Sequence, residues 1–138
     1  GLHAAGLRFR LHVADLPGKP DIVLPKFRSV VFVHGCFWHG HAGCKNFRIP
    51  KTRPEFWMAK INNNRDRDAR AITAICDAGW RVLVVWECAT RSIRVGNLVP
   101  IVAAWLQGAE TSAELGMNGL VFPREFRPRV VEKQEIQT

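Results

Sequence analysis

The sequence predicts an α/β fold in which helices pack on a mixed β-sheet. Two runs rich in β-branched residues, at 29–33 and 80–87, are typical of buried strands. Between them, residues 53–78 carry apolar side chains at helical spacing up to Gly79, with Asn62–Asn64 as the one place where the helix could be interrupted. Strands followed by helix, strand and helix favour this layered architecture, and 138 residues with 47% hydrophobic content suit a single domain, 1–138, with one core.

The remaining segments have weaker patterns. Residues 7–13 alternate as a half-buried strand, residues 22–24 form a short strand after a Pro- and Gly-rich turn, and residues 95–106 form an amphipathic helix. The stretch 34–50 has no sustained period and is too long for an ordinary turn, which indicates a functional or metal-ordered loop. Residues 125–138 are expected to be a polar tail or a loosely docked arm.

Charge is concentrated in the first half of the chain. Twenty Lys and Arg against twelve Asp and Glu give a net charge of +8, and residues 1–60 hold ten basic and three acidic side chains (+7). Such an excess favours a polyanionic partner, and aromatic side chains among the basic ones favour nucleic acid over a merely soluble basic surface. The aromatic residues are Phe37, Trp38, Phe47, Phe56 and Trp57, and the basic residues near them are Lys45, Arg48, Lys51, Arg53 and Lys60.

The same composition excludes several classes of protein. No apolar run is long enough to span a membrane, so no membrane partner is expected. The first residues lack the pattern of a signal peptide, and four cysteines are too few for a secreted disulfide scaffold. The expected setting is therefore intracellular, with cysteines available for metal.

Cysteine and histidine residues form a compact group. Cys36, His39, His41 and Cys44 fall within nine residues, and Cys88 follows the second buried strand. Thiolate and imidazole suit tetrahedral zinc, and a short loop with one more ligand from a distant strand is a common closed site. There are five candidates for four positions, which leaves one of the two histidines for another role. The alternative is a set of buried cysteines without metal beside an exposed histidine loop.

An acidic residue stands where divalent-metal catalysis of phosphodiester cleavage would need it. Asp21 begins the short strand, and His34 ends the next one. One nuclease superfamily has an acid and a lysine on that second strand, but SVVFVHG has neither. In a nuclease of that fold, histidine would have to be the second catalytic component, since it can accept a proton from water near neutral pH. The alternative is that Pro20-Asp21 is simply a turn.

Three motifs in order, HGCFWH, TRPEFW and WECA, make residues 6–90 resemble the very short patch repair endonuclease family. The resemblance implies a restriction-endonuclease-like fold with a structural zinc site. It also implies an endonuclease that nicks one strand beside the thymine of a T·G mismatch formed by deamination of 5-methylcytosine. Since the match begins partway through the family's first helix, the family's N-terminal segment is expected to be missing.

The resemblance also assigns roles to single positions. Asp21 would bind catalytic Mg²⁺ together with the backbone carbonyl of Val33, where a well-known family member has threonine. His39 would be the general base, and His34 the second essential histidine. The implied zinc ligands are Cys36, His41, Cys44 and Cys88. The implied aromatic wedge beside the mismatch consists of Phe37, Trp38 and Trp57.

Two alternatives to a mismatch nickase remain. One is a related restriction or mobile-element endonuclease that cuts matched DNA, and the other is a zinc-stabilised DNA-binding module without catalysis. The presence of Asp21, His34 and His39 together favours an enzyme, and the wedge residues favour mismatch recognition. The further expectations are a monomer acting on double-stranded DNA, mismatch-repair proteins as partners, and a bacterial-type cytoplasmic location near the nucleoid.

Overall fold

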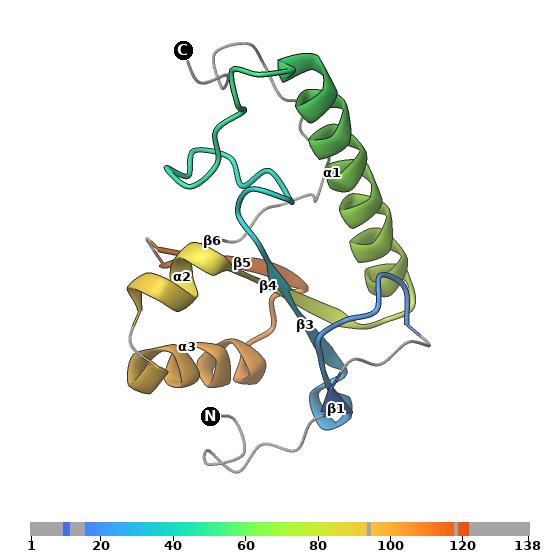
Figure 1. Cartoon of the computed structure of the whole chain (residues 1–138). Coiled ribbons are helices and arrows are strands. Elements are labelled where there is room, and N and C mark those ends of the chain that lie inside the picture. Colours follow the sequence, from blue (N-terminus) through green and yellow to red (C-terminus); the bar gives the residue numbers. More distant parts are fainter. Residues whose placement is uncertain (1–9, 12–15, 94, 118, 122–138) are drawn as a thin grey trace.

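A six-stranded sheet in the order β1-β2-β3-β4-β5-β6 forms the centre of the computed structural model, which describes residues 10–11, 16–93, 95–117 and 119–121 (Figure 1). The central strands β3, β4 and β5 run parallel, and the outer pairs are antiparallel. The strands are β1 (Arg10–Leu11), β2 (Ile22–Leu24), β3 (Ser29–His34), β4 (Arg81–Trp86), β5 (Ser112–Gly116) and β6 (Gly119–Val121). The predicted mixed sheet is confirmed.

Helices cover both faces of the sheet. Figure 1 shows α1 (Pro54–Asp77) on one side and α2 (Glu87–Ser92) and α3 (Val95–Gln107) on the other. Pro54 at the first helical position suits the start of α1, because its missing N–H would have no partner inside the helix. The helix runs without a break through Asn62–Asn64 and ends just before Gly79, which has a φ of +89°. A 3-10 helix at Pro25–Phe27 separates β2 from β3.

The core has two layers because side chains alternate across the strands. In β4, Val82 and Val84 face the layer that contains Ile72 and Ile75 of α1, whereas Leu83 and Val85 face the layer that contains Trp105 of α3. Both layers are fully apolar at their centres, as expected for parallel strands covered by helices. The long loop that follows β3 therefore starts from a strand that is buried on both faces except at Val33.

Among the described residues, the structure contains four elements that the sequence pattern did not predict: the 3-10 helix at Pro25–Phe27, α2, β5 and β6. The β5 segment, SAELG, has no β-branched residue, and it becomes a strand by parallel pairing with β4. Of the predicted strand 7–13, only Arg10–Leu11 belongs to the described residues, and the predicted tail 125–138 lies outside them. Among the helices that the structure describes, none has the length and apolarity needed to cross a membrane.

Candidate active site and metal centre

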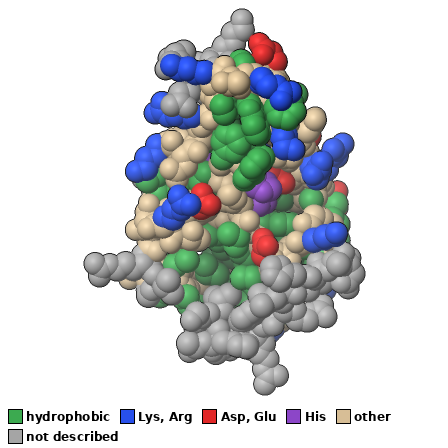
Figure 2. Space-filling view, viewed as in Figure 1, with side chains coloured by type: hydrophobic (Ala, Val, Ile, Leu, Met, Phe, Trp, Pro, Cys, Tyr) green, Lys and Arg blue, Asp and Glu red, His purple; other side chains and the backbone are tan. Residues whose placement is uncertain are grey.

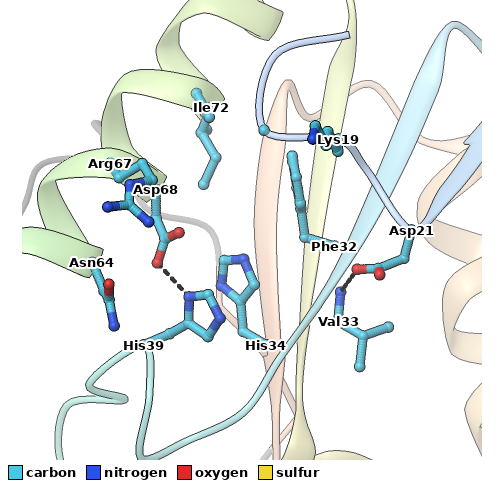
Figure 3. Close-up of a pocket in the computed structure, with 12 residues that line it drawn as sticks. Lys19, Asp21, Phe32, Val33, His34, His39, Asn64, Arg67, Asp68 and Ile72 are labelled. Atoms are coloured by element: carbon cyan, nitrogen blue, oxygen red, sulfur yellow. Dashed lines mark hydrogen bonds and ion pairs between the residues drawn. The ribbon is translucent and has the colours of Figure 1, made fainter. Parts of the chain in front are cut away.

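An open pocket of about 420 Å³ lies between the segment that precedes β2, the end of β3 and α1 (Figure 3). The three residues predicted as catalytic, Asp21, His34 and His39, all line it. Asn64 and Asp68 contribute polar groups from α1. A concave site with a few convergent polar groups has the form of a small-ligand or catalytic site, and we call it the catalytic pocket.

The carboxylate of Asp21 is oriented by the neighbouring strand. Asp21 directly precedes β2, which pairs with β3 so that Ile22 lies opposite Val31. The backbone N–H of Val33 donates to Asp21 Oδ2 at 2.7 Å. Figure 3 shows this bond beside the end of β3, where His34 also projects into the pocket. Short antiparallel pairing thus places the predicted metal-binding carboxylate next to Val33, the residue whose carbonyl was predicted to share the metal.

The two histidines form one stacked unit. The rings of His34 and His39 are parallel to within 2°, with centroids 3.9 Å apart. Burial, reinforced by the proximity of His39 and opposed by Asp68, lowers the pKa of His34 to about 4. His34 is therefore a neutral imidazole at neutral pH, able to accept or donate a hydrogen bond without carrying charge.

Asp68 of α1 completes this unit, and the sequence analysis missed it. Its Oδ2 lies 2.6 Å from Nδ1 of His39 (Figure 3). A carboxylate on one ring nitrogen fixes the tautomer and ring orientation of a histidine, which leaves Nε2 as the nitrogen that can take up a proton. One feature of the sequence could have pointed to Asp68: Asn64 and Asp68 are four residues apart, so both polar side chains lie on one face of the predicted helix. Nothing in the sequence indicated that this face meets the loop.

The four predicted zinc ligands also come together. Ligand atoms of Cys36, His41, Cys44 and Cys88, which we call the zinc cluster, all lie within 4.8 Å of one another. Three of these residues come from the loop after β3, and Cys88 comes from α2. The donor set of three sulfurs and one imidazole is typical of structural zinc, so the cluster could hold a zinc ion. His39 is outside this set, so it is the histidine left for the catalytic pocket.

The surroundings of the zinc cluster fit a bound metal. Backbone N–H groups of Cys88 and Asn46 point at sulfur, at 3.3 Å from Cys36 Sγ and 3.4 Å from Cys44 Sγ. Such bonds stabilise thiolates. Burial lowers the pKa of His41 to about 4, which keeps its imidazole in the neutral form that binds metal. Burial also raises the pKa of the Cys36 thiol to about 12, so we expect metal binding to release its proton.

The predicted wedge residues form an aromatic cluster, defined here as Phe37, Trp38 and Trp57. Ring centroids of Phe37 and Trp57 lie 5.6 Å apart, and those of Trp38 and Trp57 lie 6.0 Å apart. Trp38 is 50% exposed, far more than a loop anchor buried in a core would be. The exposed part of this surface is therefore Trp38, next to His39. Phe37 and Trp57 are half-buried and pack against the apolar cluster of Phe47, Ile49 and Ile61.

Basic side chains surround this surface. Figure 2 shows hydrophobic side chains in the upper half of the molecule with Lys and Arg side chains on both sides of them. The four predicted DNA contacts in the second half of the loop and before α1 are exposed: Lys45, Arg48, Lys51 and Arg53. Arg53 also lies over the ring of Phe56, 4.4 Å from its centroid. The arrangement suits a polyanion with aromatic bases.

Comparison with known proteins places the chain in a family. Residues 1–46 match the family model described as DNA mismatch endonuclease Vsr. The chain is 44% identical over 122 residues to the DNA mismatch endonuclease Vsr of Escherichia coli, a match that covers 86% of this chain and 78% of that protein. It is 59% identical over 87 residues to the type II nicking enzyme V.XorIIP of Xanthomonas oryzae pv. oryzae, covering 63% of each chain. A third relative, the type II nicking enzyme V.NmeAIP of Neisseria meningitidis, is 48% identical over 83 residues, which span 59% of its length.

The long match to the Escherichia coli protein extends across most of the chain, beyond the segment that the family model covers. The chain spans less than two thirds of two of the three relatives named above. On the identity and coverage of the match to the Escherichia coli protein, the chain belongs to the Vsr family of DNA mismatch endonucleases.

Proposed function

We propose that this protein is an endonuclease that nicks one strand of duplex DNA beside the thymine of a T·G mismatch, by magnesium-dependent hydrolysis. The observation that carries the proposal is one pocket containing an oriented carboxylate, Asp21, and a histidine, His39, held by Asp68, one residue from an exposed tryptophan. A metal-binding carboxylate, a proton acceptor and a surface for bases are the parts that the reaction needs.

His39 is the proposed general base. Its Nδ1 is bonded to Asp68, so its Nε2 is the nitrogen that can accept a proton from the attacking water. As that proton moves to His39, the water oxygen bonds to phosphorus and the bond from phosphorus to the leaving sugar oxygen breaks. The released sugar oxygen takes up a proton from solvent water and becomes a hydroxyl group. The parallel ring of His34 supports His39 from one side and, being neutral, offers hydrogen bonding to the phosphate or the water.

Magnesium fits the donors at the Asp21 side of the pocket. The carboxylate of Asp21 and the carbonyl of Val33 are hard oxygen ligands, and the remaining positions of an octahedral ion are usually filled by water and phosphate oxygens. Bound magnesium would polarise the phosphate and lower the pKa of water. The zinc cluster has no role in the chemistry, because four protein ligands leave no open position. We propose that zinc orders the loop that carries His39.

The aromatic cluster is the proposed mismatch reader. Insertion of an aromatic ring between base steps costs unstacking energy, and a wobble pair is already poorly stacked, so insertion costs least there. The exposed basic residues Lys45, Arg48, Lys51 and Arg53 would contact phosphates and set position along the duplex without reading sequence. We further propose that residues 1–138 act as one nuclease domain and as a monomer, since nicking one strand needs one site.

Strand cleavage tests the proposal. Zinc-loaded protein is incubated with end-labelled duplexes that differ only in a central T·G or C·G pair, with and without Mg²⁺. Magnesium is left out rather than chelated, so that the zinc cluster keeps its metal. We expect a cut only in the thymine strand of the mismatched duplex and only with magnesium. Equal cutting of both duplexes would instead favour an endonuclease for matched DNA. Binding without cutting would favour a non-catalytic module.

Asp21→Asn is the matching variant. It removes a proposed metal ligand and one negative charge near the phosphate, so nicking should disappear while DNA affinity stays level or rises. Its fold should persist, because an amide oxygen can still accept the bond from the Val33 N–H. An unchanged nicking rate would remove Asp21 from the mechanism.

A further inference from the structure

Arg65 is a charged residue in the buried stripe of α1. The buried residues of this helix are Ile61, Arg65, Ala69, Ile72 and Ile75, at the spacing of one helical face. Arg65 is 7% exposed and is the charged member of that stripe. Because a buried cation is costly unless it is well bonded, its partners show what it does.

The guanidinium of Arg65 binds the loop at a point between the catalytic pocket and the zinc cluster. Both Nε and Nη2 donate to the carbonyl oxygen of Gly40, Nε at 2.9 Å. Its Cζ also lies 5.3 Å from the centre of the Phe47 ring, in the apolar cluster that the loop forms with Ile61 of α1. Gly40 stands between His39, in the catalytic pocket, and His41, in the zinc cluster. Arg65 therefore holds the peptide that joins the two sites.

Glycine at position 40 lets Arg65 approach the backbone, and its conformational freedom is the reason why the bond from Arg65 is needed. Its φ is +62°, and a Cβ at this position would overlap Arg65 Nε and lie 2.6 Å from Ile61 Cγ2, so only glycine lets the backbone approach so closely. A glycine is also the residue about which the chain turns most easily. Zinc bound at the zinc cluster would fix His41, but rotation at Gly40 could still move His39.

Two neighbouring side chains of α1 hold the same segment. Asn64 Nδ2 donates to the carbonyl of Trp38 at 2.7 Å, and Asp68 bonds the ring of His39. Arg65 adds the bond at Gly40, so residues 38, 39 and 40 are each held by one side chain of the helix. α1 itself packs on the sheet through Ile72 and Ile75, and His34 belongs to β3 of that sheet. The bonds from α1 therefore fix the position of residues 38–40 relative to His34.

We propose that Arg65 is a positioning residue for strand cleavage: by bonding the Gly40 carbonyl it locks the glycine hinge and keeps His39 stacked on His34 and bonded to Asp68. The inference rests on the proposed function, in which His39 is the general base. Arg65 does not touch the reacting atoms, so its loss should slow the chemical step and leave DNA affinity and zinc content unchanged.

The test compares Arg65→Ala and Arg65→Lys with Arg70→Ala. Arg70 is exposed on the same helix, so its variant controls for loss of one positive charge. Zinc content, thermal unfolding, affinity for the T·G duplex and single-turnover nicking at saturating protein are measured for each. Displacing a catalytic group by about 1 Å can lower a rate about 100-fold, so we expect nicking by both Arg65 variants to fall about 10- to 100-fold. Arg70→Ala should stay within about twofold of the parent rate.

Two further readouts separate positioning from general support of the fold. Free guanidinium ion at millimolar concentration should partly restore nicking by Arg65→Ala, because it can occupy the same donor site. In ¹⁵N-labelled protein, the imidazole signals of His39 should shift in the zinc-loaded Arg65→Lys protein and those of His41 should not. This measurement needs no activity.

Several outcomes would overturn the proposal. Nicking within about twofold of the parent by folded, zinc-loaded Arg65→Lys would do so, and loss of zinc from both Arg65 variants would assign Arg65 to the stability of the zinc loop instead. If the parent protein itself nicks no duplex, the proposed function fails. The imidazole spectrum then still tests whether Arg65 holds the ring of His39 in place. Unchanged His39 signals in Arg65→Lys would then end the inference by themselves.

Discussion

The substitution Asp68→Asn tests the proposed role of the His39–Asp68 pair. Asn keeps the size and the acceptor oxygen of Asp68 but removes its charge, and the amide can also present an N–H to the ring. In that second orientation His39 would have its proton on the wrong nitrogen, and Nε2 could no longer accept one. The side chain is partly buried and lies in the middle of α1, outside the buried stripe of the helix, so the fold should tolerate the change.

The expected size of the effect comes from the contact itself. His39 Nδ1 and Asp68 Oδ2 are 2.6 Å apart, within the range of a charge-assisted hydrogen bond, and side-chain exposures of 29% and 19% leave the pair mostly shielded from water. Hydrogen bonds to charged groups contribute about 1.5–3 kcal/mol. If that bond strengthens as His39 takes up a proton, its loss lowers the cleavage rate about 10- to 150-fold, at about 1.4 kcal/mol for each factor of ten.

The assay is single-turnover nicking of the T·G duplex at saturating protein, with DNA affinity measured separately. Asp66→Asn is the matched control, because Asp66 is an exposed carboxylate two residues away on the same helix and does not line the catalytic pocket. We expect a slower rate for Asp68→Asn with unchanged affinity, and a parent-like rate for Asp66→Asn. Equal rates for the two variants would refute the idea that Asp68 orients the general base.

The remaining predictions concern the zinc cluster and the aromatic cluster. Cys88→Ser should release zinc and lower Tm by about 10 °C or more, because structural zinc contributes folding free energy directly. Cys76→Ser should keep zinc, since Cys76 packs at the edge of the apolar core instead, and equal zinc content in the two variants would contradict the assignment. Trp38→Ala should weaken binding of the T·G duplex by about 1–3 kcal/mol, the usual contribution of one stacked base, while binding of the C·G duplex changes little. An equal loss on both duplexes would make Trp38 a general DNA contact.

The parts of the fold that the sequence predicted are those in which the pattern is local. The strand at 29–33 and the helix at 53–78 carry their own periodicity and boundaries, and both form as predicted. β5 could not be predicted in this way. Its segment has weak strand propensity and becomes a strand because Ala113 and Leu115 pair beside β4 and are buried there.

In the candidate site, too, the residues indicated by local sequence features were predicted, and those that act over long sequence distances were not. Cys36, His39, His41 and Cys44 are close in the chain, so their spacing indicated a possible metal-binding loop without deciding between the two histidines. Asp21 was indicated by its place at the start of a strand, and the family resemblance assigned His41 to zinc and His39 to catalysis. Asp68 and Arg65 could not be found this way, because each acts on a residue more than twenty positions away, and in the sequence both read as ordinary charges on a polar helix.

The sequence by itself therefore determined the chemistry of the groups: oxygen, sulfur and imidazole donors, an aromatic loop and a basic first half. Only the tertiary structure decided their partners. The parallel pairing of β3 with β4 brings Cys88 to the loop, and the packing of α1 on the sheet brings Asp68 to His39 and Arg65 to Gly40. Side-chain identity sets what an atom can bind, whereas the burial of distant apolar faces against one another sets which atoms meet.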